Sequence, residues 1–366
     1  MGRGWIVGLA AGLAVVLFGY GAVRHFTGAR YIEKRLSNAI ASANGVNQVR
    51  VGSSSFSPWR GTFVARDFEF LPDTLLLAQR TRAGTPPRTR YSVTAASLRV
   101  HGIRFWPLLR KRIVADSVSV DGARVDVYFD RTAGPKPPVR PATLPHVSFQ
   151  SIDRPIRIGV IRVTNTQIGY AEKAKDGSRP GSIQFTDLSA TAYNVTNDST
   201  RMTPSTPCTI DLRTRIAGAG RLDAKFGYDL LSPRLSMTYR GTIARMSTEP
   251  LNELLVSLEG IQITSGVMDS TWFDFKVSED VASGKMLVLY RDLDFKMLDK
   301  VTLDRGLIAR LQTYFTNKTQ LSDANPTDGK TPARVVVILR ERRPETGLFK
   351  FLWETLREGV LSTLGV

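Results

Sequence analysis

The sequence is poor in residues that bind metals or form disulfides, with one cysteine and three histidines among 366 residues. A single cysteine, Cys208, excludes a disulfide within the chain, so cysteine usage does not indicate the redox compartment. His25, His101 and His146 have no second histidine, cysteine or carboxylate at ligand spacing, which argues against a zinc site. Cys208 begins a segment with period-two apolar residues and is predicted to be a small buried hydrophobic residue.

Signatures of catalysis are also missing. The sequence contains no phosphate-binding loop, dinucleotide fingerprint or nucleophile elbow in a strand–helix context. Isolated carboxylates such as Asp116, Asp121 and Asp126 fall at or near the ends of predicted strands, where a solvated strand face accounts for them. We therefore expect a protein that is not an enzyme, with no catalytic residue, no metal and no cofactor.

Acidic residues are under-represented, because 50 Lys and Arg stand against 33 Asp and Glu, a net charge of +17. The densest basic cluster is 110–112 (RKR), followed by Arg340, Arg342 and Arg343. Neither comes with zinc-finger spacing, a basic helix with heptads or an aromatic RNA-binding motif, so we expect no nucleic-acid partner. An anionic membrane surface is the partner class that the charge favours, with plain solubility as the alternative.

Long apolar runs are absent except at residues 5–23 (WIVGLAAGLAVVLFGYGAV), which carry no charge. At 1.5 Å per residue this run spans roughly 28 Å, close to the hydrocarbon thickness of a bilayer. A cleaved signal peptide is the competing interpretation, disfavoured by the length of the run and its poor cleavage site. We expect an uncleaved transmembrane anchor over 1–28 with the bulk of the chain on the periplasmic side. Its membrane residues include Trp5, Leu9, Leu13, Leu17 and Phe18.

Amphipathic periodicity predicts helices over 29–43, 248–258, 306–315 and 347–364. The last helix pairs Lys350 with Glu354 on its polar face. Its apolar stripe either caps the end of the sheet or lies on a membrane surface near the basic residues that precede it. This stripe consists of Phe349, Leu352, Trp353, Leu356, Val360 and Leu364.

Most of the remaining chain alternates apolar and polar residues at period two, clearly over 124–130, 221–228, 234–240, 273–276 and 292–297. Strands of this kind have one apolar and one solvated face, as in antiparallel sheets. Turn signals between the predicted strands are Asp121-Gly122, Asp176-Gly177, Gly218-Ala219-Gly220, Ser232-Pro233 and Ser283-Gly284.

The predicted fold is mainly β: an N-terminal transmembrane helix followed by a long curved antiparallel sheet with a few amphipathic helices. About 50 predicted helical residues are too few to cover about 150 strand residues. The sheet therefore either closes on itself as a sandwich or barrel, or forms an open gutter. The apolar positions that share its interior are Val125, Val127, Phe129, Leu222, Phe226, Met237, Tyr239, Phe273, Phe275 and Phe295.

Three segments are predicted to be long exposed loops, over 79–90, 131–146 and 317–332, and the second is stiffened by proline. The predicted organisation is an anchor (1–28), a helix and the start of the sheet (29–130), a proline-rich loop (131–146), the rest of the sheet (147–343) and a C-terminal helix (344–366).

Three stretches resemble the AsmA-like proteins of Gram-negative envelopes. They are HGIRFWPLLRKRIVADSVSVDGARVDVYFD (101–130), IQITSGVMDSTWFDFKV (261–277) and ARVVVILRERRPETGLFKFLWETLREGVLSTL (333–364). In that family's pattern the first is a strand, a leucine-leucine turn, a basic strand start and then a strand pair. The third is similar to the closing strand and helix of a branch of unknown function. This chain is much shorter than the large family members.

The resemblance implies a hydrophobic β-groove, anchored in the bacterial inner membrane, that binds or conducts phospholipid or other acyl lipid between envelope membranes. About 15 strands at 4.8 Å would give a groove of about 70 Å. Each acyl CH₂ kept from water gains about 0.8 kcal/mol, so an apolar groove lowers the barrier to crossing water. The alternative is an envelope scaffold or assembly factor for outer-membrane proteins, with a closed β-core and other envelope proteins as partners.

Overall fold

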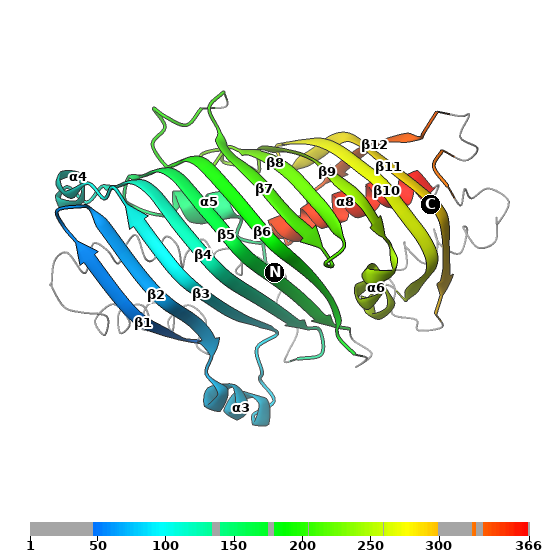
Figure 1. The fold of residues 1–366 in the computed structure, drawn as a ribbon, viewed down its shortest axis with the longest axis horizontal. Helices are drawn as coiled ribbons and strands as arrows, with labels where there is room; N and C mark the ends of the chain where they lie inside the picture. Colours follow the sequence, from blue (N-terminus) through cyan, green and yellow to red (C-terminus); the bar gives the residue numbers. More distant parts are fainter. Residues whose placement is uncertain are drawn as a thin grey trace.

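In a computed structural model, the described residues form one curved, 12-stranded sheet in which each strand pairs with the next along the chain (Figure 1). The structure describes residues 47–133, 140–174, 179–203, 205–258, 260–298, 324–326 and 332–364. The predicted anchor and the predicted helices over 29–43 and 306–315 lie outside these residues. Among the described helices, none is long and apolar enough to cross a membrane.

The strands confirm the segments of period-two alternation, except that residues 234–236 precede β9. They are β1 (Asn47–Ser57), β2 (Thr62–Pro72), β3 (Thr89–His101), β4 (Ile113–Asp130), β5 (Ile156–Lys173), β6 (Gly181–Thr196), β7 (Cys208–Ile216), β8 (Gly220–Tyr228), β9 (Met237–Ser247), β10 (Ile261–Ser278), β11 (Val281–Met297) and β12 (Val335–Glu341). The helices are α3 (Thr74–Arg82), α4 (Phe105–Leu109), α5 (Pro145–Gln150), a 3₁₀ turn η1 (Glu249–Leu251), α6 (Asn252–Leu258) and α8 (Leu348–Leu364).

The sheet is open and mixed. β1 and β12 stand at opposite ends of the strand order, so the closed sandwich or barrel is wrong and the open arrangement is confirmed. The expectation of antiparallel pairing throughout is wrong at one place, because β4 and β5 are parallel. The connection between these strands returns to the end of the sheet where β4 begins, so β5 enters in the same direction. Parallel pairs need such a crossover.

A line of residues with left-handed backbone in neighbouring strands accounts for one expected turn that is absent. Asp121-Gly122 lies inside the 18-residue strand β4, so the predicted strand pair over 101–130 is one long strand after α4. Gly122 has φ 63°, the conformation that made this dipeptide resemble a turn. Asn165 of β5 and Asp187 of β6 are also left-handed, and the register shifts beside them. β-Bulges at such shifts bend a strand and increase its twist, which suits a curved sheet.

The turn expected at Ser283-Gly284 is also wrong, because both residues belong to β11. The chain reverses at Glu279-Asp280, where both residues have positive φ, as two-residue hairpin turns require. Gly284 serves a different purpose: a Cβ there would lie 2.6 Å from the Phe275 ring. The turns at Gly218-Ala219-Gly220 and Ser232-Pro233 are confirmed, with Gly220 already the first residue of β8. The turn predicted at Asp176-Gly177 lies outside the described residues.

Two of the predicted exposed loops need correction. Residues 79–82 belong to α3, whose start is capped by the Asp73 carboxylate accepting from the Leu75 and Leu76 N–H groups. In the proline-rich segment, Leu144 and His146 are buried instead of exposed, because the chain here crosses the sheet. The described part of the third loop, 324–326, joins the sheet through the Tyr290–Asn325 bridge.

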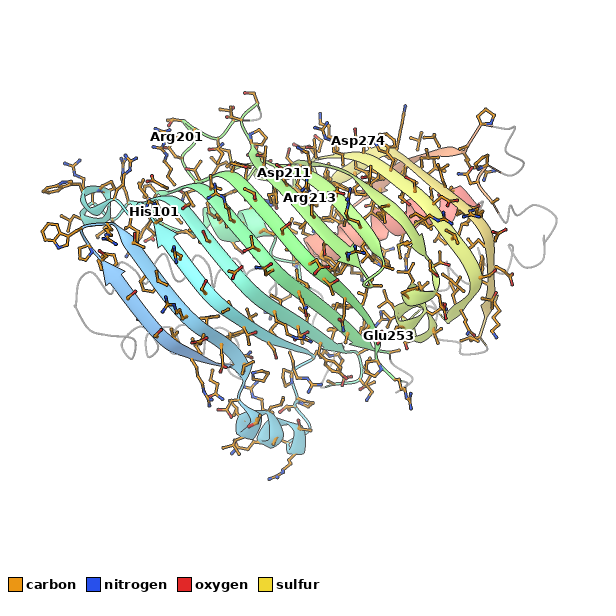
Figure 2. The ribbon with its side chains drawn as sticks, viewed as in Figure 1. His101, Arg201, Asp211, Arg213, Glu253 and Asp274 are labelled. Carbon is orange, nitrogen blue, oxygen red and sulfur yellow. The ribbon has the colours of Figure 1, made fainter. Side chains whose placement is uncertain are left out.

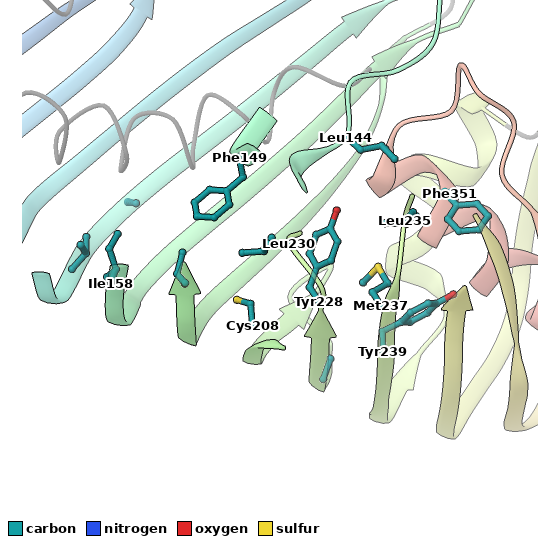
Figure 3. Packing of buried hydrophobic residues seen from close by; sticks show 14 of the residues in the cluster. Leu144, Phe149, Ile158, Cys208, Tyr228, Leu230, Leu235, Met237, Tyr239 and Phe351 are labelled. Carbon is teal, nitrogen blue, oxygen red and sulfur yellow. The ribbon is translucent and has the colours of Figure 1, made fainter. Parts of the chain in front are cut away.

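The C-terminal amphipathic helix and the helix over 248–258 are both confirmed, as α8 and as η1 with α6. α8 packs against β11 and β12, with Phe351, Thr355 and Gly359 buried in the contact. α6 contacts β5, β6 and β10. α5 and α8 lie on the same side of the sheet, which we call the inner face (Figures 1 and 3).

Candidate functional site

Two rows of side chains cross the inner face along the strand register, and neither contains a charged residue. The first inner row is Phe56, Phe63, Val100, Val118, Ile161, Ala192, Ile210, Phe226, Tyr239, Phe275, Gly284 and Ile338. The second inner row is Ser54, Ala65, Leu98, Val120, Val163, Ala190, Leu212, Ala224, Gly241, Phe273, Met286 and Val336. With 12 strands about 4.8 Å apart, this apolar band is about 53 Å long, shorter than the expected 70 Å.

The outer face has the opposite character (Figure 2). Lys225 lies 3.1 Å from Asp211 on the neighbouring strand, and Asp223 pairs with both Arg213 at 3.0 Å and Arg221 at 2.8 Å. These groups are largely solvated, so each pair contributes little to stability. The difference between the faces reflects the period of two in each strand.

At the C-terminal end of the band, α8 covers the inner rows. Phe351 is fully buried, and Tyr239 stacks on Phe275 with ring centroids 5.1 Å apart. Arg340 of β12 binds two carboxylates of α8, Glu354 at 2.7 Å and Glu358 at 2.5 Å. We call the covered inner face of β9–β12 the C-terminal flank. These two carboxylates neutralise the charge of Arg340.

The crossover between β4 and β5 forms a margin of the inner face at the end where β5 begins (Figure 3). Leu144 and Phe149 are buried there, and Gln150 donates to the Leu230 and Ser232 carbonyls at 2.9 Å. A hydrogen bond of 2.9 Å joins His146 Nδ1 to the Tyr228 hydroxyl. Burial lowers the pKa of His146, so the imidazole is neutral at pH 7.

The opposite margin carries a neutralised charge. Arg131 and Tyr170 both donate to the buried Glu172 carboxylate, and burial together with that carboxylate raises the pKa of Tyr170. Glu172 pairs in register with Gly181, and α6 approaches this glycine so closely that a Cβ would lie 2.9 Å from the Ser257 side chain. The apolar face therefore ends here at a polar cluster and a short helix.

Between these margins the middle of the band is only half-buried. Residues of both inner rows on β1–β3 are mostly buried, as they are on β9–β12. On β4–β8 most of them retain solvent exposure, and only Val118 and Ala224 are buried. We call this region the central window: Val120, Ile161, Ala192, Ile210, Leu212 and Phe226. Its side chains are aliphatic or aromatic, with no hydrogen-bonding group to orient a polar ligand. The window suits flexible apolar chains.

The predicted interior residues divide between these regions. Phe226 lies in the central window, and Leu222 is half-buried beside it on β8. Val125, Val127 and Phe129 are half-buried toward the Glu172 end of β4. The others are buried: Met237, Tyr239, Phe273 and Phe275 in the C-terminal flank, and Phe295 farther along β11.

Only Phe226 of the central window was among the predicted interior residues, so the sequence patterns missed the other five, Ile161 and Ala192 among them. The bulges at Asn165 and Asp187 shift the alternation of β5 and β6 by one residue, so neither strand has one clean apolar series. Cys208 is buried at the margin, as predicted, and burial raises the pKa of its thiol to about 12. Among the described side chains, no group of three metal-ligating residues comes together.

On α8, the predicted apolar stripe is not the face that is most deeply buried, which consists of Phe351, Thr355, Gly359 and Thr363. Leu352, Leu356, Val360 and Leu364 are half-buried against the core, while Phe349 and Trp353 are exposed. The Lys350–Glu354 pair is confirmed at 3.7 Å.

No protein-family model matches the chain, and a search of curated proteins gives no match.

Proposed function

We propose that this protein binds the acyl chains of a phospholipid or similar lipid along its inner band, as a membrane-anchored carrier between envelope membranes. The observation that carries the proposal is the central window: a half-buried, uncharged surface continuous with apolar rows on all twelve strands. The resemblance to AsmA-like proteins and the apolar run at 5–23 support the placement at the inner membrane, with the bulk in the periplasm.

The energetics favour an acyl ligand. Each CH₂ moved from water to an apolar surface gains about 0.8 kcal/mol, so several methylenes offset the ordering of one chain. A charged headgroup has no counter-charge on the inner rows and stays at a margin or in water. The inner face therefore discriminates between lipids by the length of their acyl chains and not by the chemistry of their headgroups.

The test is to count phospholipid that co-purifies with the full chain, by lipid extraction and mass spectrometry. Ile210→Asp and Phe226→Asp place a carboxylate in the window, and both should lower bound lipid severalfold. Thr209→Asp is the matched control, because Thr209 is exposed on the other face of β7. The lipid that co-purifies with Thr209→Asp measures the total that the window and the rest of the chain bind when the window is unchanged. Equal lipid in all four proteins, with folding intact by circular dichroism, would contradict the proposal.

A second candidate, an assembly factor for other envelope proteins, is favoured by one observation. Among the described strands β12 pairs only with β11, and its outer side chains Val335, Val337 and Leu339 are exposed. An apolar edge strand is a template for pairing with another chain. If the lipid proposal holds, Val337→Lys should leave the amount of co-purifying lipid unchanged. If β12 instead pairs with another envelope protein, the same substitution should abolish assembly of that protein in the cell.

A further inference from the structure

One corner of the sheet combines exposed tryptophans with a cluster of cations. The β1–β2 turn and the segment leading into α4 meet there, since Ile103 N–H donates to the Gly61 carbonyl at 2.8 Å. This contact needs glycine, because a Cβ at Gly61 would lie 2.5 Å from the Ile103 oxygen. In Figure 1, α4 stands at the end of the sheet beside β1 and β2. We call this corner the α4 tip: Trp59, Arg60, Arg104, Trp106, Leu109, Arg110, Lys111 and Arg112.

The apolar side chains of the α4 tip project into solvent. Trp59 is 99% exposed, Trp106 76% and Leu109 56%. Tryptophan is highly buried on average in soluble proteins, and its ring is among the largest apolar surfaces a residue can offer. Two such rings at one corner form an exposed apolar patch of the kind that marks an interaction site.

The charge around this patch is almost all positive. Arg60, Arg110, Lys111 and Arg112 are exposed, and they belong to the tip's own two loops. Among the described residues, Asp116 lies 3.7 Å from Arg104, and Asp198 interacts electrostatically with Arg112. Exposed tryptophan surrounded by arginine and lysine is the composition of segments that dock at the interface of anionic membranes.

The opposite end of the same strands provides a comparison. α3 has no buried residue and exposes Leu75 at 77%, with Arg80 and Arg82 in its last turn. It carries no aromatic side chain. β2 has 11 residues, so about 37 Å of strand separates α3 from the α4 tip. Of these two ends of the strands, the α4 tip is the one that combines aromatic rings with a cation cluster.

We propose that the α4 tip docks on an anionic bilayer, with Trp59 and Trp106 in the headgroup region and residues 110–112 on lipid phosphates. This contact is separate from any transmembrane anchor and from acyl-chain binding in the central window, so either proposal can fail without the other.

The experiment follows tryptophan fluorescence in the full chain, incorporated into vesicles by detergent removal. One protein keeps only Trp59 and Trp106 (W5F, W272F, W353F). Its matched control keeps only Trp272 and Trp353 (W5F, W59F, W106F), which are less exposed, at 40% and 37%, and lie elsewhere. The vesicles are phosphatidylcholine with or without phosphatidylglycerol, and brominated acyl chains serve as quenchers.

The tip protein should show blue-shifted emission and strong bromolipid quenching when phosphatidylglycerol is present, and the control protein should not. Reversing charge at the tip (R110E, K111E, R112E) should lower the ratio of docked to undocked tips about 100-fold, from about 1 kcal/mol per cation. The α3 variant R80E, R82E should leave quenching unchanged. Absence of quenching, equal quenching without anionic lipid, or quenching that survives the charge reversal would overturn the proposal.

Discussion

The central window and the C-terminal flank belong to the same two inner rows, yet they differ in what covers them. In the flank, α8 lies on β11 and β12, fixed by Phe351 and by the pairing of Arg340 with Glu354 and Glu358. In the window, equally apolar residues on β4–β8 remain half-buried. The C-terminal flank is a buried hydrophobic core, whereas the central window has the same apolar composition but stays partly exposed.

This difference separates two roles that one sequence pattern cannot distinguish. Phe226 and Phe275 both alternate with charged neighbours, and both lie in the first inner row, with Tyr239 between them. Phe275 is 1% exposed within an aromatic cluster, whereas Phe226 keeps part of its ring accessible. The same substitution at the two sites should therefore have different consequences.

The largest expected effect is that of Phe275→Asp, which places a carboxylate in the covered flank. We expect the free energy of unfolding to fall by at least about 4 kcal/mol, from the lost ring and the buried charge. Phe226→Asp should cost much less and leave the circular dichroism spectrum intact. Denaturant unfolding of the full chain in mild detergent measures both, and equal losses at the two sites would erase the distinction between flank and window.

The next largest effect tests how α8 packs on the C-terminal flank. Phe351→Ala removes a side chain with 0% exposure from α8 and should cost about 3–5 kcal/mol. Trp353→Ala, on the same helix but 37% exposed, should cost under about 1.5 kcal/mol. A greater loss at Trp353 than at Phe351 would mean that α8 presents a different face to the sheet.

A smaller effect concerns the crossover that borders the window. Because burial lowers the pKa of His146, the unfolded chain takes up a proton near its ordinary value of about 6.5 before the folded chain does. Stability should be constant above pH 7.5 and fall as the pH drops through about 6.5, by at most about 1.4 kcal/mol per pH unit.

The control is His146→Asn, which retains a polar side chain without a titrating group. It should flatten the slope of stability between pH 7.5 and 5, measured by denaturant unfolding at each pH. A slope that survives this substitution would assign the pH dependence to other groups.

The smallest effect is expected on the outer face. Asp223→Asn removes the charge that pairs with Arg213 and Arg221, and these pairs are largely solvated. The cost should be under about 1 kcal/mol and should shrink with added salt. A cost above about 2 kcal/mol would show that the outer ion pairs, and not the inner rows, hold the strands together.

Features of the fold that depend on neighbouring residues could be predicted from the sequence, and features that depend on contacts between distant segments could not. Period-two alternation predicted the strands, because each strand's faces are determined locally by burial on one side. Asp121-Gly122 was predicted to be a turn, but it lies inside β4, where Gly122 has the left-handed backbone that a turn would also use. The parallel pairing of β4 and β5 depends on where a long crossover returns, which no local pattern encodes.

The central window could be predicted only in part. Phe226 was found from alternation, but Ala192 is too small to stand out, and Ile161 lies on a strand whose alternation is interrupted by a bulge. Which apolar residues are covered depends on α8 and on the buried crossover around Leu144, contacts between segments distant in sequence. Burial, and not residue type, separates the window from the flank.

Acyl-chain binding, as proposed, takes place at the central window and not on the outer face. A photoreactive benzoylphenylalanine placed singly at Ile210, Asp211, Lys225 or Phe226 tests this in the full chain, within cells or membranes. Positions 210 and 226 face inward and positions 211 and 225 outward on the same two paired strands. We expect phospholipid adducts, identified by mass spectrometry, at 210 and 226 and none at 211 and 225. Equal adducts on both faces, or none at 210 and 226, would contradict acyl-chain binding at the window.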